Sequence, residues 1–232
     1  MITSGGELAR RAAADGVAAV FVPPALPPRA ALGYSLVSLL ELLQALGFQG
    51  EGEHAALEAH EVLAAGTSLL APESPVAENP AKKLAQALQG RVVVVYTAAR
   101  FLAGVGQRWK GQINENAKTP SFTNVLPELN HNESVGWEAL RPWHERFGVV
   151  CLRDREEHPR AARQMEWTRA MLAGEGLTVV EATPTGTSRL ARLLSLVQLG
   201  DWVSLYLAAL AGVDPYPITK IDALKRSLET MR

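Results

Sequence analysis

The sequence is poor in the features that mark several protein classes. It has one cysteine, Cys151, and its 24 acidic and 23 basic residues leave a formal net charge of −1 at pH 7. A single cysteine excludes an intrachain disulfide framework and fits a reducing compartment. Without a surplus of positive charge there is no electrostatic case for binding nucleic acid. Because Cys151 lies in the apolar run 149–152, we expect a buried structural thiol rather than a nucleophile.

Targeting and membrane signals are also scarce. Residues 1–6 are polar and no long apolar stretch follows them, so the sequence predicts no secretory signal and a cytoplasmic protein. One segment, Leu193 to Val213, approaches the length and apolarity of a membrane span. It contains Asp201, whose charge would be costly in lipid. We therefore expect a buried helix or a subunit-interface helix, and no membrane insertion.

The order of elements predicts an α/β fold. Three short apolar runs have the composition of parallel strands that are buried on both faces: residues 92–95, 148–152 and 177–180. Helical periodicity follows each of these runs, over residues 101–117, 161–173 and 188–211. Strands that alternate with helices favour a parallel sheet with right-handed crossovers. A last short helix is expected over 221–231.

The first part of the chain has a different pattern. It supplies one apolar strand, 17–22, which we expect to be buried, and several helices, which is too little sheet for an α/β domain of its own. This part has the composition of the tail of a domain. The prolines at 72 and 75 indicate a linker. The sequence therefore predicts a partial domain over 1–75 and a complete domain over 76–232.

A crowded run of polar side chains lies between Trp109 and Trp137. Amides, carboxylates and an imidazole are poor core material, and nine of these residues gather here: Asn114, Glu115, Asn116, Asn124, Glu128, Asn130, His131, Asn132 and Glu133. A solvated loop could hold them, but the two flanking tryptophans favour a pocket wall. If Glu115 and His131 meet in a cleft, they are a candidate general base and its acid–base partner. They can meet only if the chain doubles back across the prolines at 120 and 127.

Metal binding has less support from the spacing of residues. His131 with Glu128 or Glu133 lacks the His-x-x-x-His or Cys-x-x-Cys pattern of common sites, so we expect no metal. The remaining histidines stand among charged residues and are expected at the surface: His54, His60, His144 and His158.

Other candidates are a turn and two cations. The hydroxyls and glycine of Ala182 to Ser188 precede a helix, where they could hold a phosphate or form an ordinary N-cap and turn. No Walker-type lysine or Gly-x-Gly-x-x-Gly accompanies them, which favours the turn.

Arg29 and Lys225 are either surface cations or groups that stabilise an anionic intermediate.

Several motifs together resemble one family. They are Asn-Glu-Asn-Ala-Lys at 114–118, Leu-Pro-Glu-Leu-Asn-His-Asn at 126–132, Gly-Trp at 136–137, Pro-Arg-Ala-Ala-Leu-Gly at 28–33, Glu-Asn-Pro-Ala-Lys at 78–82, and Asp-Pro at 214–215 followed by Ile-Asp-Ala-Leu-Lys at 221–225. In this order they closely resemble the bifunctional phosphoglucose/phosphomannose isomerases, which are two-domain proteins of the sugar isomerase (SIS) type. The resemblance covers nearly the whole chain. It implies a SIS-type three-layer α/β/α sandwich with a parallel sheet, preceded by a partial first SIS domain.

The resemblance also implies a reaction and residue roles. The family interconverts glucose 6-phosphate or mannose 6-phosphate with fructose 6-phosphate through an enediol, and it requires no metal or organic cofactor. Glu115 would be the base that moves a proton between C1 and C2, and Lys225 would lie near the ring oxygen. His131 would open the sugar ring, at a site in the partner subunit of a homodimer. Arg29 would steady the enediolate. The neighbouring amides are expected to contact the substrate: Asn114, Asn116, Asn130 and Asn132.

One part of the family pattern is missing from the chain. Relatives carry a Ser-x-Ser-Gly-x-Thr loop that grips the sugar phosphate, and no such motif is present here. Three interpretations follow. The chain is an isomerase completed by a first SIS half from elsewhere, a non-catalytic SIS-type phosphosugar-binding module, or a structural subunit that uses the helix 193–213 as its interface. The presence of Glu115, His131, Arg29 and Lys225 together favours the isomerase.

Overall fold

The computed structural model describes residues 1–24, 26–48 and 50–229. The chain forms two compact units, and we call Met1–Gly52 unit 1 and the residues from Glu53 onward unit 2. The expected residues 230–231 of the last helix lie outside the described residues. The sequence-based boundary between residues 75 and 76 stays a prediction.

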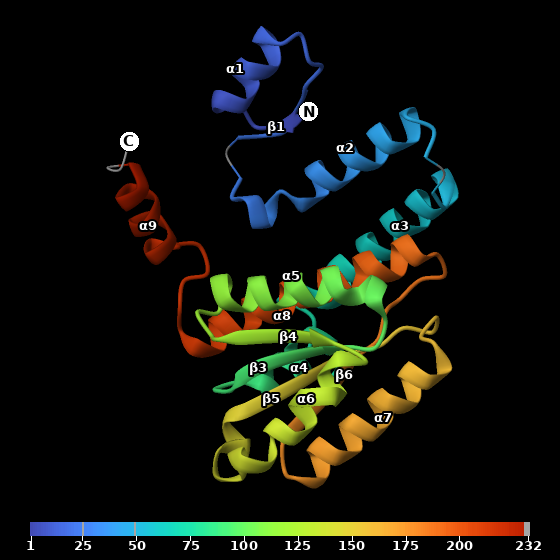
Figure 1. The fold of residues 1–232 in the computed structure, drawn as a ribbon, viewed down its shortest axis with the longest axis vertical. Coiled ribbons are helices and arrows are strands. Elements are labelled where there is room, and N and C mark those ends of the chain that lie inside the picture. The colour runs from blue at the N-terminus through green and yellow to red at the C-terminus, as the bar shows by residue number, and fades with distance from the viewer. Residues whose placement is uncertain (25, 49, 230–232) are drawn as a thin grey trace. The chain divides into compact units, whose positions relative to one another are not determined.

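Unit 2 alternates strands and helices, as the sequence predicts. In chain order its elements are α3 (Gly52–Leu70), α4 (Pro80–Leu88), β3 (Val92–Thr97), the 3₁₀ helix η2 (Arg100–Leu102), α5 (Ala103–Asn116), β4 (Ser121–Val125), α6 (Glu128–Gly136), the 3₁₀ helix η3 (Glu138–Arg146), β5 (Phe147–Leu152), α7 (Pro159–Gly174), β6 (Thr178–Ala182), α8 (Arg189–Ala211) and α9 (Thr219–Glu229). Figure 1 shows the strands as one layer in the middle of this unit.

The four strands form one parallel sheet in the order β4-β3-β5-β6. Three of them are the apolar runs that the sequence identifies as strands. Strand β4 is not predicted, because it lies inside the polar run and only two of its five residues are apolar. It lies at the edge of the sheet, where Phe122 is exposed and Ser121 is buried. A half-exposed edge strand does not need the continuous apolar composition of a central strand.

Helices cover both faces of the sheet and bury two separate cores. Val93 and Val95 pack in one core with residues of α4, α5 and α8, including Trp109. Val94 and Tyr96 face the other way, into a core that holds Leu129 and Trp137 of the α6 side together with residues of α7. Figure 1 shows α5 and α8 on one side of the strands and α6 and α7 on the other. The expected three-layer α/β/α sandwich with a parallel sheet is confirmed.

Helix α8 is the one described helix that is long and apolar enough to cross a membrane. In unit 2 it packs against α4 and α5, with Leu196, Val203 and Leu207 buried. Its mid-helix carboxylate, Asp201, accepts two hydrogen bonds from Arg108, at 3.0 and 2.6 Å. Burial raises the pKa of Asp201 and the arginine opposes that rise. The helix is thus packed as a core helix of unit 2.

Two side chains, those of Cys151 and His144, test the burial that the sequence predicts for single residues. Cys151 is fully buried in β5, which confirms the structural thiol, and burial raises the pKa of this thiol to about 12. His144, expected at the surface, is buried, so that expectation is wrong. Its Nδ1 lies 2.9 Å from the carbonyl oxygen of Glu175 and its Nε2 lies 3.0 Å from that of Trp137. One of these carbonyl groups lies 7 residues from His144 in sequence and the other lies 31 residues away, and the local sequence does not reveal the second contact.

Unit 1 is a small βαβ arrangement followed by a helix. Strands β1 (Ile2–Thr3) and β2 (Val20–Phe21) pair in parallel, and α1 (Gly6–Ala14) connects them. The 3₁₀ helix η1 (Pro28–Ala30) and α2 (Leu32–Ala45) follow. The sequence predicts a buried strand over 17–22, but only two of these residues are in a strand. Val20 and Phe21 are 45% and 66% exposed, because no layer of unit 1 covers them.

The contact between α8 and Trp109 yields a stability prediction. The Trp109 indole donates a 2.8 Å hydrogen bond to the carbonyl oxygen of Leu196, and a Cβ on Gly200 would lie 2.3 Å from the indole nitrogen. Gly200→Ala is therefore expected to lower the free energy of unfolding by about 2 kcal/mol, despite the better helix propensity of alanine. Urea denaturation followed by circular dichroism measures it.

Gly111→Ala is the matched control, since a Cβ there meets nothing within 4 Å inside α5. This control should be neutral or stabilising by up to about 1 kcal/mol. Equal effects of the two substitutions would contradict the close packing of Trp109 on α8.

Candidate functional site

The last turn of α5 is held in place by two asparagine side chains. Asn114 donates to the carbonyl oxygen of Lys110 at 2.9 Å, and its Oδ1 accepts from the backbone amide of Ser121 at 3.1 Å. Asn116 is buried and donates to the hydroxyl of Ser204 in α8 at 2.9 Å. The half-buried Glu115 lies between these two anchored residues. The helix end that carries the predicted base is therefore fixed to both β4 and α8.

A lysine joins this helix end to the C-terminal segment. The ammonium of Lys118 donates to the carbonyl oxygens of Glu115, Pro215 and Pro217, the last at 2.7 Å. The backbone of Lys118 has a φ of 55°, in the left-handed conformation that often ends helices. A cation at this position also interacts favourably with the negative end of the helix dipole. We call this set of three hydrogen bonds the Lys118 clasp.

The clasp also holds the segment that precedes the helix carrying Lys225. The clasped residues 215–217 lead directly into α9, which carries Lys225 on an exposed surface. The structure therefore brings the backbone of Glu115 together with the segment that holds Lys225. In the sequence, Lys118 is noticeable only as the last residue of the family motif at 114–118. Its spacing from the Pro-Tyr-Pro segment, 97 and 99 residues, gave no sign of the contact.

His131 is exposed on α6, and polar contacts fix the helix beneath it. The Tyr96 hydroxyl donates to Glu133 at 2.6 Å and accepts from the Trp137 indole at 3.2 Å, and Asn124 also donates to Glu133. Burial, followed by the contact with Glu133, raises the pKa of Tyr96, which keeps its hydroxyl protonated. This network joins α6 to β3 and β4.

The two predicted asparagines of α6 face different neighbours. Asn130 accepts a 2.6 Å hydrogen bond from Thr168 of α7. Asn132 donates to Glu128 at 3.2 Å on the exposed side of the helix. Asn130 therefore supports the packing of α6 on α7, whereas Asn132 lies beside His131 in sequence and at the surface.

The sheet separates Glu115 from His131 within one chain. The end of α5 lies beside Ser121, the first residue of β4, whereas α6 begins just after the last residue of that strand. A strand of five residues is roughly 15 Å long. The two helices also cover opposite faces of the sheet. The chain therefore does not double back to bring the carboxylate and the imidazole into one cleft.

The turn before α8 is occupied by a carboxylate from α3. Glu58 accepts hydrogen bonds from the backbone amides of Thr187 and Ser188, the latter at 2.8 Å. The Ser188 hydroxyl caps the helix by accepting from Ala191 at 3.2 Å. Glu58 thus takes the place that an anion would take at a helix N-terminus. Sequence reasoning missed it because Glu58 lies 129 residues from Thr187.

The hydrogen bonds to Glu58 change its acidity. Those from Ser188, and then that from Thr187, lower the pKa of Glu58 from 4.5 to about 2. The structure supports the N-cap interpretation of the segment 182–188 over the phosphate site.

Comparison with known proteins agrees with this arrangement. The family model described as the bacterial phospho-glucose isomerase C-terminal SIS domain matches residues 77–228. The chain belongs to this SIS-domain family. The matched range holds every candidate residue except Arg29, which lies half-buried in η1 of unit 1.

Curated relatives extend the match beyond the SIS domain. The bifunctional phosphoglucose/phosphomannose isomerase of Caldicellulosiruptor bescii is 41% identical over 231 residues, which is 100% of this chain and 68% of that protein. The protein of the same name from Aquifex aeolicus is 35% identical over 98% of this chain and 67% of its own length. The chain thus spans about two thirds of the length of these relatives.

A solved structure resembles the fold. A glucose-6-phosphate isomerase like protein from Thermus thermophilus superposes with a TM-score of 0.68 at 29% identity, over 86% of this chain and 66% of that one. The expected membership of the phosphoglucose/phosphomannose isomerase type, with a SIS-type fold, is confirmed.

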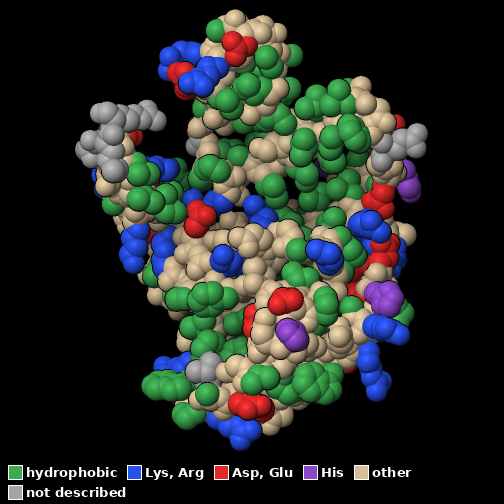
Figure 2. Space-filling model, viewed as in Figure 1, with side chains coloured by type: hydrophobic (Ala, Val, Ile, Leu, Met, Phe, Trp, Pro, Cys, Tyr) green, Lys and Arg blue, Asp and Glu red, His purple; other side chains and the backbone are tan. Residues whose placement is uncertain are grey.

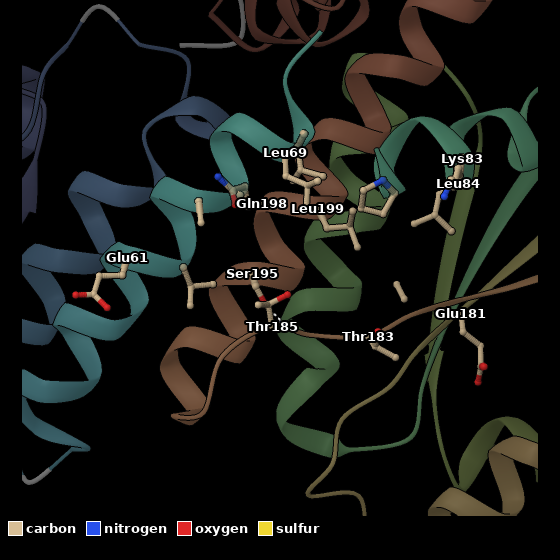
Figure 3. Close-up of a pocket in the computed structure, with 16 residues that line it drawn as sticks. Glu61, Leu69, Lys83, Leu84, Glu181, Thr183, Thr185, Ser195, Gln198 and Leu199 are labelled. Atoms are coloured by element: carbon tan, nitrogen blue, oxygen red, sulfur yellow. Dashed lines mark hydrogen bonds between the residues drawn. The ribbon is translucent and has the colours of Figure 1, made fainter. Parts of the chain in front are cut away.

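A cavity of about 660 Å³ lies in unit 2, between α3, α4, α8 and the end of β6. Its walls are mainly apolar, and Figure 3 shows Leu69, Leu84 and Leu199 on them, with Thr185 and Ser195 joined by a hydrogen bond. Residues of the turn 182–188 contribute to its wall, whereas Glu115, His131 and Lys225 do not line it. Among the described residues, no group of three His, Cys, Asp or Glu side chains is placed to hold a metal ion.

The carboxylate before α8 makes stability depend on pH. Because the pKa of Glu58 is lower in the folded protein, its contribution is fully present above pH 4.5 and is lost as the pH falls toward 2. Glu58→Gln should therefore lower the melting temperature at neutral pH, and the difference from wild type should vanish as the pH approaches 2. Thermal unfolding across this range measures it, with Glu53→Gln on the same helix as the control. A difference that stayed constant with pH would contradict the assignment.

The Lys118 clasp predicts a local effect on the C-terminal segment. Lys118→Gly keeps the left-handed backbone without strain and removes the side chain together with its ammonium. Amide hydrogen exchange over residues 216–229 should become about tenfold faster, because charge-assisted hydrogen bonds are lost, while the rest of the SIS domain is unchanged. Lys220→Ala, which removes a charge from α9 outside the clasp, should leave these rates as they are. Unchanged exchange in Lys118→Gly would show that α9 is held by other contacts.

Proposed function

We propose that this chain carries the acid–base machinery of an isomerase that interconverts glucose 6-phosphate or mannose 6-phosphate with fructose 6-phosphate. The observation that carries the proposal is the Lys118 clasp, which joins the helix end bearing Glu115 to the segment bearing Lys225. A carboxylate and a cation on adjoining segments suit proton abstraction next to a carbonyl group. Membership of the isomerase family supports the same assignment. We further propose that the enzyme acts in the cytoplasm.

The proposed reaction moves one proton along the open-chain sugar. The Glu115 carboxylate removes the hydrogen on C2 of the aldose as a proton, and the electrons of that bond form the C1–C2 double bond of an enediolate. A proton then passes from the C2 hydroxyl to the C1 oxygen, and the protonated carboxyl returns its proton to C1, which leaves the carbonyl group at C2 and gives the ketose. Arg29 and Lys225 would offset the negative charge that develops on the sugar oxygens. Glucose and mannose 6-phosphate pass through the same enediol, because they differ only at C2.

Ring opening is assigned to His131 of a second copy of the chain. The sheet lies between Glu115 and His131 in one copy, so one chain cannot present both groups to the same sugar. An exposed imidazole on α6 is accessible to a neighbouring subunit. A homodimer with shared sites is therefore part of the proposal. Asn132, exposed beside it, is the better candidate of the two α6 amides for contact with the sugar. The side chains of Asn114 and Asn116 would contribute indirectly, because they hold the helix end that carries Glu115 in place.

The test is formation of fructose 6-phosphate from glucose 6-phosphate and from mannose 6-phosphate by the purified chain. Glu115→Gln is nearly isosteric but cannot accept the proton, so turnover should fall at least about 100-fold with an unchanged melting temperature. Glu138→Gln, at an exposed carboxylate of η3, is the matched control and should keep full turnover.

Full activity in Glu115→Gln would overturn the assignment of the base. The wild-type chain is assayed alone and together with the portion of a relative that it does not match. Absence of turnover in both assays would favour the non-catalytic SIS-type binding module.

A further inference from the structure

Helix α6 is short and has little apolar contact with the sheet. It has nine residues, and Leu129 is the one that is buried. Its other large apolar side chain, Val135, is 64% exposed. Figure 2 shows a histidine side chain at the surface in the region of this helix. Most helical stability in proteins comes from the packing of an apolar face. Apolar packing alone therefore does little to hold α6 in one orientation.

Two polar side chains supplement this packing on the same face of α6. At 100° per residue, Leu129, Asn130 and Glu133 lie within an arc of about 100°. Asn130 accepts from Thr168 of α7 at 2.6 Å, and Glu133 accepts from residues of β3 and β4. His131 lies on the opposite side of the helix and is exposed. The contacts on the inner face therefore determine the direction in which the imidazole points.

The position of Glu133 requires two hydrogen-bond acceptors. The Tyr96 hydroxyl of β3 donates to Oε2 at 2.6 Å, and the Asn124 amide of β4 donates to Oε1 at 2.5 Å. The Trp137 indole donates to the same hydroxyl at 3.2 Å, so the proton of that hydroxyl is directed at Glu133. A carboxylate has two acceptor oxygens and no donor, and thus matches both strands. A glutamine would match one of the two donors, and a leucine would match neither.

A carboxylate holds a helix at a higher cost than an apolar side chain does. Glu133 is half-buried, and the two groups that donate to it are neutral. Withdrawing a charge from water costs free energy that an apolar side chain of similar size would not lose. The carboxylate adds direction, because hydrogen bonds depend on angle whereas apolar contacts do not. This arrangement suits a helix that has to present one side chain accurately.

We propose that Glu133 is a positioning residue for His131, because it orients α6 so that the imidazole meets the sugar bound at the second copy. This inference rests on the proposed function, since it gives Glu133 a part in ring opening. The Glu133 carboxylate faces the sheet and does not touch the sugar. Its loss should therefore slow ring opening at the neighbouring site, while Glu115 of the same chain stays intact.

Complementation between variants tests this role, because it separates the two halves of the shared site. Glu133→Gln alone should lower kcat on glucose 6-phosphate at least about tenfold with little change in KM, since small misplacements of a reacting group are costly. Tyr96→Phe, which keeps the carboxylate and removes one donor, should have the same kind of effect. Glu138→Gln, the same change at an exposed carboxylate of η3, is the matched control and should keep full activity.

Each variant is then mixed, dissociated and reassembled with one of two partners. With Glu115→Gln, Glu133→Gln should recover about a quarter of wild-type activity, because half of the random dimers combine an intact base with a correctly oriented imidazole. With His131→Ala it should recover nothing beyond its own residual activity. A variant that was merely less stable would not distinguish the two partners. Equal recovery with both partners, or an unchanged kcat in Glu133→Gln alone, would overturn the proposal.

Amide hydrogen exchange gives a readout that needs no turnover. Exchange over residues 128–136 should become about tenfold faster in Glu133→Gln, while β3 and β5 are unchanged, because a charge-assisted hydrogen bond of α6 is lost. Unchanged exchange in α6 would show that other contacts orient this helix, and would overturn the proposal.

The same experiments separate this proposal from the proposed function. Wild-type turnover with full activity in Glu133→Gln would keep the isomerase and reject the positioning role. Absence of wild-type turnover in both assays of the proposed function would reject ring opening by His131. Faster exchange in Glu133→Gln would then leave Glu133 a structural role in α6 alone.

Discussion

The parallel sheet of unit 2 is buried on both faces, and this constraint determines where the chemistry-bearing residues lie. Each helix that connects two parallel strands has to run back over one face of the sheet, from the end of one strand to the start of the next. Helix α5 therefore ends near the first residue of β4, and α6 starts just after the last residue of that strand. Glu115 and His131 are close in sequence, yet the sheet lies between them. The polar run that holds both residues crosses the sheet and forms no single pocket wall.

Helix ends account for much of the local structure. At the C-terminal end of α5, the ammonium of Lys118 binds carbonyl oxygens of the helix and of the segment that leads to α9. At the N-terminal end of α8, the carboxylate of Glu58 binds two backbone amides. Each end places a charge of the sign that the helix dipole favours. The first joins two candidate catalytic segments, and the second joins α3 to the turn after β6.

The sequence predicts the layers of unit 2 well, and for a physical reason. The central strands β3 and β5 must be apolar on both faces, so the runs at 92–95 and 148–152 are visible without a structure. The edge strand β6 is also visible, because its run at 177–180 is mostly apolar. Strand β4 and helix α6 are hidden, because an edge strand and a surface helix need only one apolar side. The positions of His144 and Glu58 depend on partners far along the chain, and no local pattern reports such partners. In unit 1, the apolar run 17–22 predicts burial that the unit itself does not provide.

The central claim is that one active site needs Glu115 from one copy and His131 from another. The direct measurement is isomerase activity after Glu115→Gln and His131→Ala chains are mixed, dissociated and reassembled, each being nearly inactive alone. The account predicts that the mixture recovers about a quarter of wild-type activity, since half of the random dimers would hold one intact site of two. A mixture no more active than the separate variants would contradict the shared site, and both groups would then have to act within one chain.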